Sequence, residues 1–207
     1  MKYFDLYVRY MKESYDEFLE ALREMGYSGV GIVFTEESIE DVREARKKAS
    51  IHGLEFFSRY NVSASDQREF NRRISKFEGK VDILASERMP KTSRIIPKKI
   101  SVISLEAATG SLIRKISSQI IPPLMEFNLK RFSKLFFESP ADSERMLRMT
   151  LLSKLYEAPL IVSSGAEDSL DLRPPLQLLY AFLGLTRSKK ISKKYISTLP
   201  RSLIPPS

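Results

Sequence analysis

Short apolar runs alternate along this chain with longer stretches in which apolar and polar residues recur at helical spacing. The apolar runs have the length of strands that are buried on both faces. They predict seven strands, over residues 3–8, 29–34, 54–62, 81–85, 100–104, 120–127 and 160–163. Pro122 and Pro123 interrupt the sixth run, so we expect that strand to start at an edge or a bulge.

The stretches between these runs carry the start and stop signals of helices. Ser14 with Glu17 and Asp66 with Glu69 are predicted capping pairs, and Asp41 stands at the capping position of the second helix. The predicted helices cover residues 14–26, 38–50, 66–79, 111–118, 139–157 and 174–183.

Repeated strand–helix units predict an α/β fold with a parallel sheet and helices outside it. We favour a TIM-barrel-like (β/α) barrel of about seven parallel strands over an open doubly wound sheet, because no glycine-rich dinucleotide loop follows the first strand. The chain has 207 residues, which is short for such a barrel. We therefore expect a single barrel domain over residues 1–207 that lacks one strand and ends in a basic helix and tail at 187–207.

The residue types that are missing exclude several classes of protein. The chain has no cysteine, which excludes disulfides, thiolate catalysis and cysteine-bound metal centres. No apolar run is long enough to span a bilayer. Asp5 stands where a signal peptide would need an apolar core, so we expect a cytoplasmic protein with no membrane partner.

The basic residues are concentrated in the second half of the chain. The net charge is +8, residues 88–131 hold nine basic and two acidic side chains, and residues 172–207 hold seven basic and none acidic. This asymmetry indicates either an anionic partner such as nucleic acid or a solvated surface with a solubilising charge excess.

Histidine chemistry is excluded as well. The single histidine, His52, follows the second predicted helix and is expected to interact with the helix dipole. Some barrel hydrolases place two metal-binding histidines one residue apart at the end of the first strand, and Tyr7 and Arg9 occupy those positions here. Neither residue is a usual ligand for zinc or iron.

Carboxylates remain as candidates at the carboxyl ends of the strands, where barrel enzymes keep their catalytic groups. Asp5, Glu106 and Glu126 either meet there and hold magnesium, or pair with inward arginines as structural bridges. The arginines available for such bridges are Arg9, Arg59, Arg114 and Arg173.

The loop after the seventh strand contains Ser163, Ser164 and Gly165, and Arg173 precedes the next helix. A nucleophilic serine is excluded, because the chain lacks both the G-x-S-x-G elbow and a histidine base. We expect the two serines to hydrogen-bond backbone or phosphate, and Gly165 to allow close backbone approach. Arg173 is expected either to bind phosphate or to fix the loop.

Two further features are typical of RNA-binding proteins, but each also fits an ordinary structural role. Aromatic residues alternate with charged ones at 56–60 and 132–137, where they either stack on RNA bases or form core. Four lysines near the C-terminus fall on one side at helical spacing, as a phosphate-binding stripe or a solvated face. These are Lys189, Lys190, Lys193 and Lys194.

Several blocks of the sequence resemble one known family. They are Tyr3-Phe-Asp-Leu-Tyr-Val8, Gly26-Tyr-Ser-Gly-Val-Gly31, Val81-Asp-Ile-Leu-Ala85, Ser163-Ser-Gly-Ala166, and Leu172-Arg173 with Leu183-Gly184. In this order they resemble component 3 of archaeal ribonuclease P, which is related to the thirty-kilodalton subunit of the eukaryotic enzyme. The chain departs from the family pattern at Pro174 and Gln177, where the family usually has serine and aspartate.

The resemblance implies a barrel that lacks the full complement of strands and a role in removing the 5′ leader of precursor tRNA. It implies that RNA is the catalyst, so that the protein has no catalytic residues, binds no metal or cofactor itself, and works with Mg²⁺ held on the RNA. The implied partners are ribonuclease P RNA, protein component 2 and the other protein components, with precursor tRNA contacted indirectly.

Under this interpretation the basic side chains bind RNA phosphates. The predicted RNA-binding residues are Arg88, Arg94, Arg114, Lys115, Arg173, Lys189, Lys190, Lys193 and Lys194. The alternative function is a barrel-type metal-dependent phosphoesterase with carboxylate ligands, and a third is a structural scaffold that only binds partners.

Overall fold

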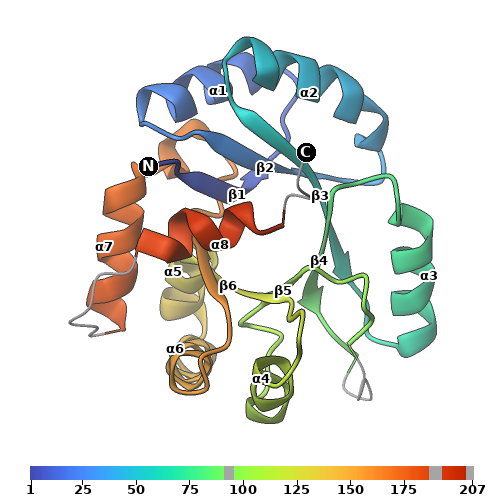
Figure 1. Cartoon of the computed structure of the whole chain (residues 1–207), viewed down its shortest axis with the longest axis vertical. Helices are drawn as coiled ribbons and strands as arrows, with labels where there is room; N and C mark the ends of the chain where they lie inside the picture. The colour runs from blue at the N-terminus through green and yellow to red at the C-terminus, as the bar shows by residue number, and fades with distance from the viewer. Residues whose placement is uncertain (91–95, 187–192, 204–207) are drawn as a thin grey trace.

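The computed structural model describes residues 1–90, 96–186 and 193–203, and within them seven parallel strands form one sheet. Each strand pairs with the next one in the chain, so the order in the sheet is the order in the sequence. The strands are β1 (Phe4–Arg9), β2 (Gly29–Phe34), β3 (Glu55–Ser63), β4 (Ile83–Arg88), β5 (Val102–Ser104), β6 (Leu124–Asn128) and β7 (Leu160–Ser163). The predicted TIM-barrel-like fold is confirmed: the sheet curves into a nearly closed barrel with helices around its outside (Figure 1).

All the described helices except the last follow the strands and cover the outer face of the sheet. The helices are α1 (Tyr15–Glu24), α2 (Val42–Ile51), α3 (Gln67–Phe77), α4 (Gly110–Ser117), α5 (Leu129–Glu138), α6 (Pro140–Leu155), α7 (Pro175–Leu185) and α8 (Thr198–Arg201). Three short 3-10 helices complete the described part of the chain: η1 (Ile39–Asp41), η2 (Ser169–Asp171) and η3 (Lys193–Ile196). None of the helices described is long and apolar enough to cross a membrane.

The apolar runs predicted the strands to within a few residues. β2 and β7 have the predicted bounds, and β6 begins at Leu124, directly after the two prolines. Ile120 and Ile121, which the sequence placed in the strand, are 100% and 89% exposed. The reason is that Pro122 and Pro123 cannot donate to a ladder, so the strand starts only beyond them.

The predicted helix caps had mixed outcomes. Asp66 caps α3 by accepting a hydrogen bond from the Glu69 amide at 2.9 Å, as predicted. The predicted capping roles of Ser14 and Asp41 are wrong, because neither side chain accepts a hydrogen bond from its helix. Asp41 already lies in a helical conformation at the end of η1, so its side chain is not placed to cap α2.

The sequence missed α5. Asn128, the last residue of β6, caps this helix by accepting a hydrogen bond from the Arg131 amide at 2.8 Å. β6 therefore passes directly into α5, with no turn residues between them to indicate a helix start. Of the aromatic residues on α5, Phe132 is buried in the core, whereas Phe136 and Phe137 are 57% and 82% exposed.

The gap between β1 and β7, where an eighth strand would lie, is bridged at two levels. Near the carboxyl ends of these strands, Val8 and Ala166 form a single parallel bridge, and the Arg9 amide donates to the Ala166 carbonyl at 2.8 Å. α8, drawn in red in Figure 1, contacts both strands. Its Leu199, with Leu203 just beyond it, packs against the apolar cluster inside the barrel.

The interior of the barrel has an apolar layer that supports the polar residues described below. The layer is formed by Phe4, Leu6, Phe57, Ile83, Ala85, Val102, Leu124 and Ile161. β1 contains a bulge between Asp5 and Val8, and β2 carries Gly31 opposite it. A Cβ atom at Gly31 would lie 2.7 Å from the Leu6 carbonyl oxygen, so only glycine allows the bulged strand to approach this closely.

Candidate functional site

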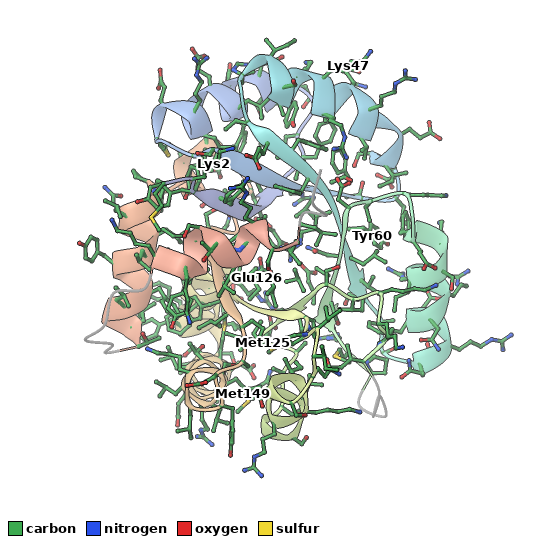
Figure 2. All side chains as sticks on the ribbon, in the orientation of Figure 1. Lys2, Lys47, Tyr60, Met125, Glu126 and Met149 are labelled. Carbon is green, nitrogen blue, oxygen red and sulfur yellow. The ribbon has the colours of Figure 1, made fainter. Side chains whose placement is uncertain are left out.

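A buried ion pair occupies the middle of the barrel. Arg59 of β3 donates two hydrogen bonds to Glu126 of β6, from Nη1 to Oε1 at 2.7 Å and from Nη2 to Oε2 at 2.6 Å. Both side chains are 1% exposed, and Figure 2 shows Glu126 inside the ring of strands. The sequence had offered this pairing as a structural bridge, and the geometry confirms it. Since a buried ion pair must offset its desolvation cost, the bidentate geometry is what stabilises it here.

Three further groups surround the Arg59 guanidinium. Its Nη1 also donates to the Leu6 carbonyl at 2.8 Å, its Nε donates to Asn61 Oδ1 at 2.7 Å, and it lies 4.6 Å from the centre of the Tyr7 ring. Burial acts to lower the pKa of Arg59, but the negative charge and hydrogen bonds of Glu126 outweigh it and the pKa is raised. Arg59 is therefore a permanent cation beneath the carboxyl ends of the strands, where barrel enzymes hold reacting groups.

Glu87, at the end of β4, is held in the same network. It accepts hydrogen bonds from the Tyr7 hydroxyl at 2.8 Å and from Asn61 Nδ2 at 2.7 Å, both to Oε1. Burial and the charge of Glu87 raise the pKa of Tyr7. Tyr7 is therefore a hydrogen-bond donor at neutral pH and not a base.

A cavity of about 300 Å³ opens above this network at the carboxyl ends of the strands, which we call the barrel mouth. Across it, Arg131 of α5 donates from Nε and Nη2 to the two oxygens of Glu106, each at 2.6 Å. These hydrogen bonds raise the pKa of Arg131. The sequence had not singled out Arg131, and it had proposed other arginines as partners for the carboxylates.

Asp5 does not reach the barrel mouth. It is fully buried beneath the loop after β7, where it accepts hydrogen bonds from the backbone amides of Tyr7 at 3.1 Å and Ser164 at 3.2 Å. Burial raises the pKa of Asp5 to about 6, although the hydrogen bonds from Ser164 and Tyr7 act in the opposite direction. Its role is to tie β1 to the loop after β7.

The three carboxylates proposed as a magnesium site are thus held separately. Glu126 is paired with Arg59, Glu106 with Arg131, and Asp5 with backbone amides. Among the residues that the structure describes, no group of three acidic or histidine side chains could hold a metal ion. The alternative in which Asp5, Glu106 and Glu126 meet at the mouth is wrong, because Phe4 and Leu6 on either side of Asp5 point into the barrel and Asp5 therefore faces the other way.

The other arginines proposed as bridges have different partners. Arg9 pairs with Glu167 at 3.9 Å, and the Arg114 guanidinium lies 5.3 Å from the centre of the Tyr156 ring. Arg173 donates from Nη1 to the carbonyls of Leu170 at 2.6 Å and Leu172 at 2.7 Å. Of the two roles predicted for Arg173, this contact is the one that fixes the loop.

The loop after β7 is packed into the protein. Ser163 and Ser164 are buried, and Ser163 Oγ has no hydrogen-bond partner in the described structure. Ser164 bonds to Asp5 through its amide, and its hydroxyl accepts from the Ala166 amide at 3.1 Å. Gly165 has φ +74°, and a Cβ there would lie 2.0 Å from Asn128 Oδ1. The predicted contact of these serines with backbone is confirmed for Ser164, and Gly165 allows the close approach that was expected.

Those predicted RNA-binding residues that the structure describes lie in more than one place. Arg88 and Lys115 line one groove beside the barrel mouth, whereas Arg114 lies against Tyr156 and lines no part of that groove. Lys193 and Lys194 lie in η3, whose Tyr195 packs on Phe182 near the end of α7. Arg94, Lys189 and Lys190 lie outside the described residues.

Comparison with known proteins places the chain beside one group of relatives. No protein-family model matches it. It is 27% identical over 197 residues to ribonuclease P protein component 3 of Methanococcus maripaludis strain C6, covering 88% of this chain and 83% of that protein. The component 3 protein of strain C7 is 26% identical over 191 residues, covering 87% and 82%. The predicted resemblance to ribonuclease P protein component 3 is confirmed.

Solved structures agree on the fold. A chain in the cryo-EM structure of archaeal ribonuclease P with mature tRNA superposes with a TM-score of 0.67 at 18% identity, covering 97% of this chain and 89% of that one. A probable 2-pyrone-4,6-dicarboxylic acid hydrolase from Acinetobacter baumannii superposes with a TM-score of 0.59 at 11% identity, covering 98% and 99%. The component 3 proteins are therefore similar to this chain in sequence, whereas the hydrolase is similar to it in fold alone.

Proposed function

We propose that this chain is a protein subunit of ribonuclease P, which assists a catalytic RNA in removing the 5′ leader of precursor tRNA. The observation that carries the proposal is the similarity in sequence to curated component 3 proteins over 88% of the chain. The fold adds support, since a chain of an archaeal ribonuclease P structure has the same architecture over nearly the whole length.

The barrel mouth supports a role without catalysis by the protein itself. In barrel enzymes this end of the strands holds the reacting groups. Here Glu126 is bonded to Arg59, Glu106 to Arg131, and Glu87 to Tyr7 and Asn61. A general base needs a lone pair directed at its substrate, and a metal site needs several such oxygens together. No specific observation favours the phosphoesterase alternative.

The partners of the protein follow from the same proposal. We expect it to bind ribonuclease P RNA together with protein component 2 and the other protein components, to contact precursor tRNA only indirectly, and to work in the cytoplasm. Mg²⁺ would be held on the RNA and not by the protein. Phe136 and Phe137 on α5 and Tyr180 on α7 are more than half exposed, which suits the apolar centre of an interface between proteins.

The RNA contacts provide the test. Purified chain is titrated with ribonuclease P RNA at several salt concentrations, with and without component 2, and co-elution of the two proteins is measured in parallel. If about six cationic side chains contact phosphates, the logarithm of the affinity falls with that of the salt concentration at a slope of about −4 to −5. The absence of salt-dependent RNA binding, with no co-elution of component 2, would contradict the proposal.

A further inference from the structure

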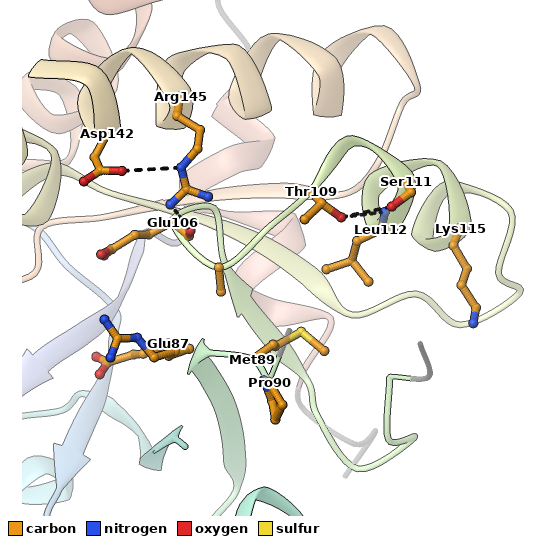
Figure 3. A pocket seen from close by; sticks show the side chains of 12 residues that line it. Glu87, Met89, Pro90, Glu106, Thr109, Ser111, Leu112, Lys115, Asp142 and Arg145 are labelled. Carbon is orange, nitrogen blue, oxygen red and sulfur yellow. Dashed lines mark hydrogen bonds and ion pairs between the residues drawn. The ribbon is translucent and has the colours of Figure 1, made fainter. Parts of the chain in front are cut away.

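A second groove lies beside the barrel mouth and shares Glu87, Arg88 and Glu106 with the cavity there. Its volume is about 730 Å³, within the range of about 300–1,000 Å³ that small-molecule sites occupy. Figure 3 shows that its walls come from the segment after β4, the loop before α4, the first turn of α4 and the start of α6. Among the residues that line it are Arg88, Met89, Ala107, Ser111, Leu112 and Lys115.

The acidic residues of the groove already have partners. Glu106 is bonded to Arg131, Glu87 accepts from Tyr7 and Asn61, and Asp142 accepts from Ser139 at 2.8 Å and pairs with Arg145 at 3.6 Å. Arg145 also donates to the Glu106 carbonyl at 2.7 Å. Two of the three acids, Glu106 and Asp142, are thus paired with arginines, whereas Glu87 is hydrogen-bonded only to neutral groups.

Arg88 is the cation best placed for an external anion. It is exposed at the end of β4, and no ion pair of its side chain is recorded among the described residues. Lys115 lies on the same groove, on α4. The first turn of α4 carries no acidic residue, and Thr109 caps it by accepting from the Leu112 amide at 3.2 Å. The backbone amides of Ser111 and Leu112 therefore lie at the positive end of the α4 helix dipole.

Apolar side chains form the rest of the lining. Met89 and Leu112 are half-buried, face the groove from opposite walls in Figure 3, and are joined there by Pro90 and Ala107. An anion alone would be bound best by charges in a polar setting. A ligand that has both a phosphate and a flat apolar face would use the two kinds of wall together.

We propose that this groove binds one unpaired nucleotide of an RNA strand, with its phosphate at Arg88 and its base between Met89 and Leu112. The inference rests on the proposed function, and it adds a specific site to it. Proteins recognise single-stranded RNA by taking unstacked bases into pockets of this kind, while cations contact the adjoining phosphates. A protein that contacted only RNA phosphates would need no cavity of this kind, because phosphates can be bound on an open surface.

The test uses the four nucleoside 5′-monophosphates as probes, with inorganic phosphate and uridine as fragments. Binding to the full chain is followed by NMR chemical shifts and by calorimetry. We expect the monophosphates to shift the amides of Ser111 and Leu112 and to bind more tightly than either fragment. Arg88→Gln should weaken binding about tenfold, the loss expected for one charge-assisted hydrogen bond. Ala107→Phe, which fills the groove without changing charge, should abolish it.

Lys47→Gln is the matched control, because it removes one positive charge, as Arg88→Gln does, but on α2. Figure 2 shows the Lys47 side chain pointing away from the barrel. This variant should leave monophosphate binding unchanged. If Ala107→Phe unfolds the chain, Ser111→Phe and Arg88→Glu replace it. Equal loss of binding in Lys47→Gln and Arg88→Gln would overturn the site, since it would show that net charge alone attracts the nucleotide. Monophosphate shifts that avoid Ser111 and Leu112 would also overturn it.

A second arm separates this inference from the proposed function. Wild type, Ala107→Phe, Arg88→Gln and Lys47→Gln are each added to ribonuclease P RNA with the other protein components, and RNA affinity is measured. If wild type does not bind, the proposed function fails. If wild type binds and the two groove variants bind equally well, the proposed function stands and the nucleotide site is wrong. Weaker binding by the groove variants alone supports both.

Discussion

Asp5 of β1 accepts a hydrogen bond from the backbone amide of Ser164, just beyond β7, at 3.2 Å. The two residues lie on opposite sides of the gap where an eighth strand would complete the barrel. A carboxylate therefore takes the place of part of the missing backbone ladder. Because this carboxylate is fully buried, its ionisation affects the stability of the whole barrel.

The first prediction concerns the pH dependence of stability. Burial raises the pKa of Asp5 to about 6 in the folded protein from its usual 3.8, so the folded state holds this proton more tightly than the unfolded state. The contribution of Asp5 to stability is then greatest at pH 4 and below, and is lost as the pH rises through about 6. We expect Asp5→Asn, relative to wild type, to be more favourable at pH 8 than at pH 4 by roughly 2 kcal/mol in urea unfolding.

Glu69 supplies the contrast for this experiment. Hydrogen bonds from Arg72 and Arg73 lower the pKa of this carboxyl to about 2, so its contribution is present at neutral pH and is lost as the pH falls. Glu69→Gln should therefore be less favourable at pH 7 than at pH 2, the opposite sign. If the effect of Asp5→Asn does not change with pH, burial of Asp5 as described here is wrong.

The second prediction concerns the ion pair in the middle of the barrel. Arg59→Met or Glu126→Leu alone leaves a buried charge without its partner, and each should lower the free energy of unfolding by about 3–5 kcal/mol. The double variant Arg59→Met/Glu126→Leu should cost less than the sum of the two, because no uncompensated charge remains. Urea unfolding of the four proteins in this cycle measures the coupling.

The control for this cycle is the exposed pair of Arg148 with Glu144 on α6, whose side chains are 67% and 72% exposed. Arg148→Gln should change stability by less than about 0.5 kcal/mol. Additive effects at Arg59 and Glu126 would contradict the pairing.

The third prediction concerns two residues with positive φ. Glu157 ends α6 with φ 55°, in a conformation that glycine adopts without strain. Glu157→Gly should raise the free energy of unfolding by about 1 kcal/mol. Gly165→Ala should lower it by at least about 2 kcal/mol, because alanine would be strained at φ +74° and its Cβ would collide with Asn128. Thermal or urea unfolding measures both, and stabilisation by Gly165→Ala would contradict the described loop.

The sequence predicted the architecture better than it predicted the site, and particular residues show why. β2 and β7 are continuous apolar runs, so burial on both faces is visible in the residues themselves. α5 was missed because its cap, Asn128, is also the last residue of β6 and no turn residues separate the two. Turn residues mark where strands and helices end, and none of them marks the boundary between β6 and α5.

The site depends on contacts between distant positions. Arg59 and Glu126 were among several possible arginine–carboxylate bridges, and only the register of β3 and β6 around the barrel selects this one. Glu106 could not be matched with Arg131 from the sequence, because Arg131 lies in the helix that was missed. Asp5 faces away from the barrel interior because Phe4 and Leu6 point inward, and the residues of this short strand do not themselves show which of its faces lies inside.

The most direct test of the central claim is the rate of 5′-leader release from precursor tRNA at low magnesium, measured with ribonuclease P RNA and the other protein components, with and without this chain. Arg59→Met/Glu126→Leu, which removes the polar centre of the barrel, is assayed beside wild type if it folds. We predict that release is fast only when the chain is present, that the chain alone cleaves nothing, and that the double variant is as active as wild type. An unchanged rate without the chain would contradict its role as a subunit, and cleavage by the isolated chain would contradict catalysis by RNA.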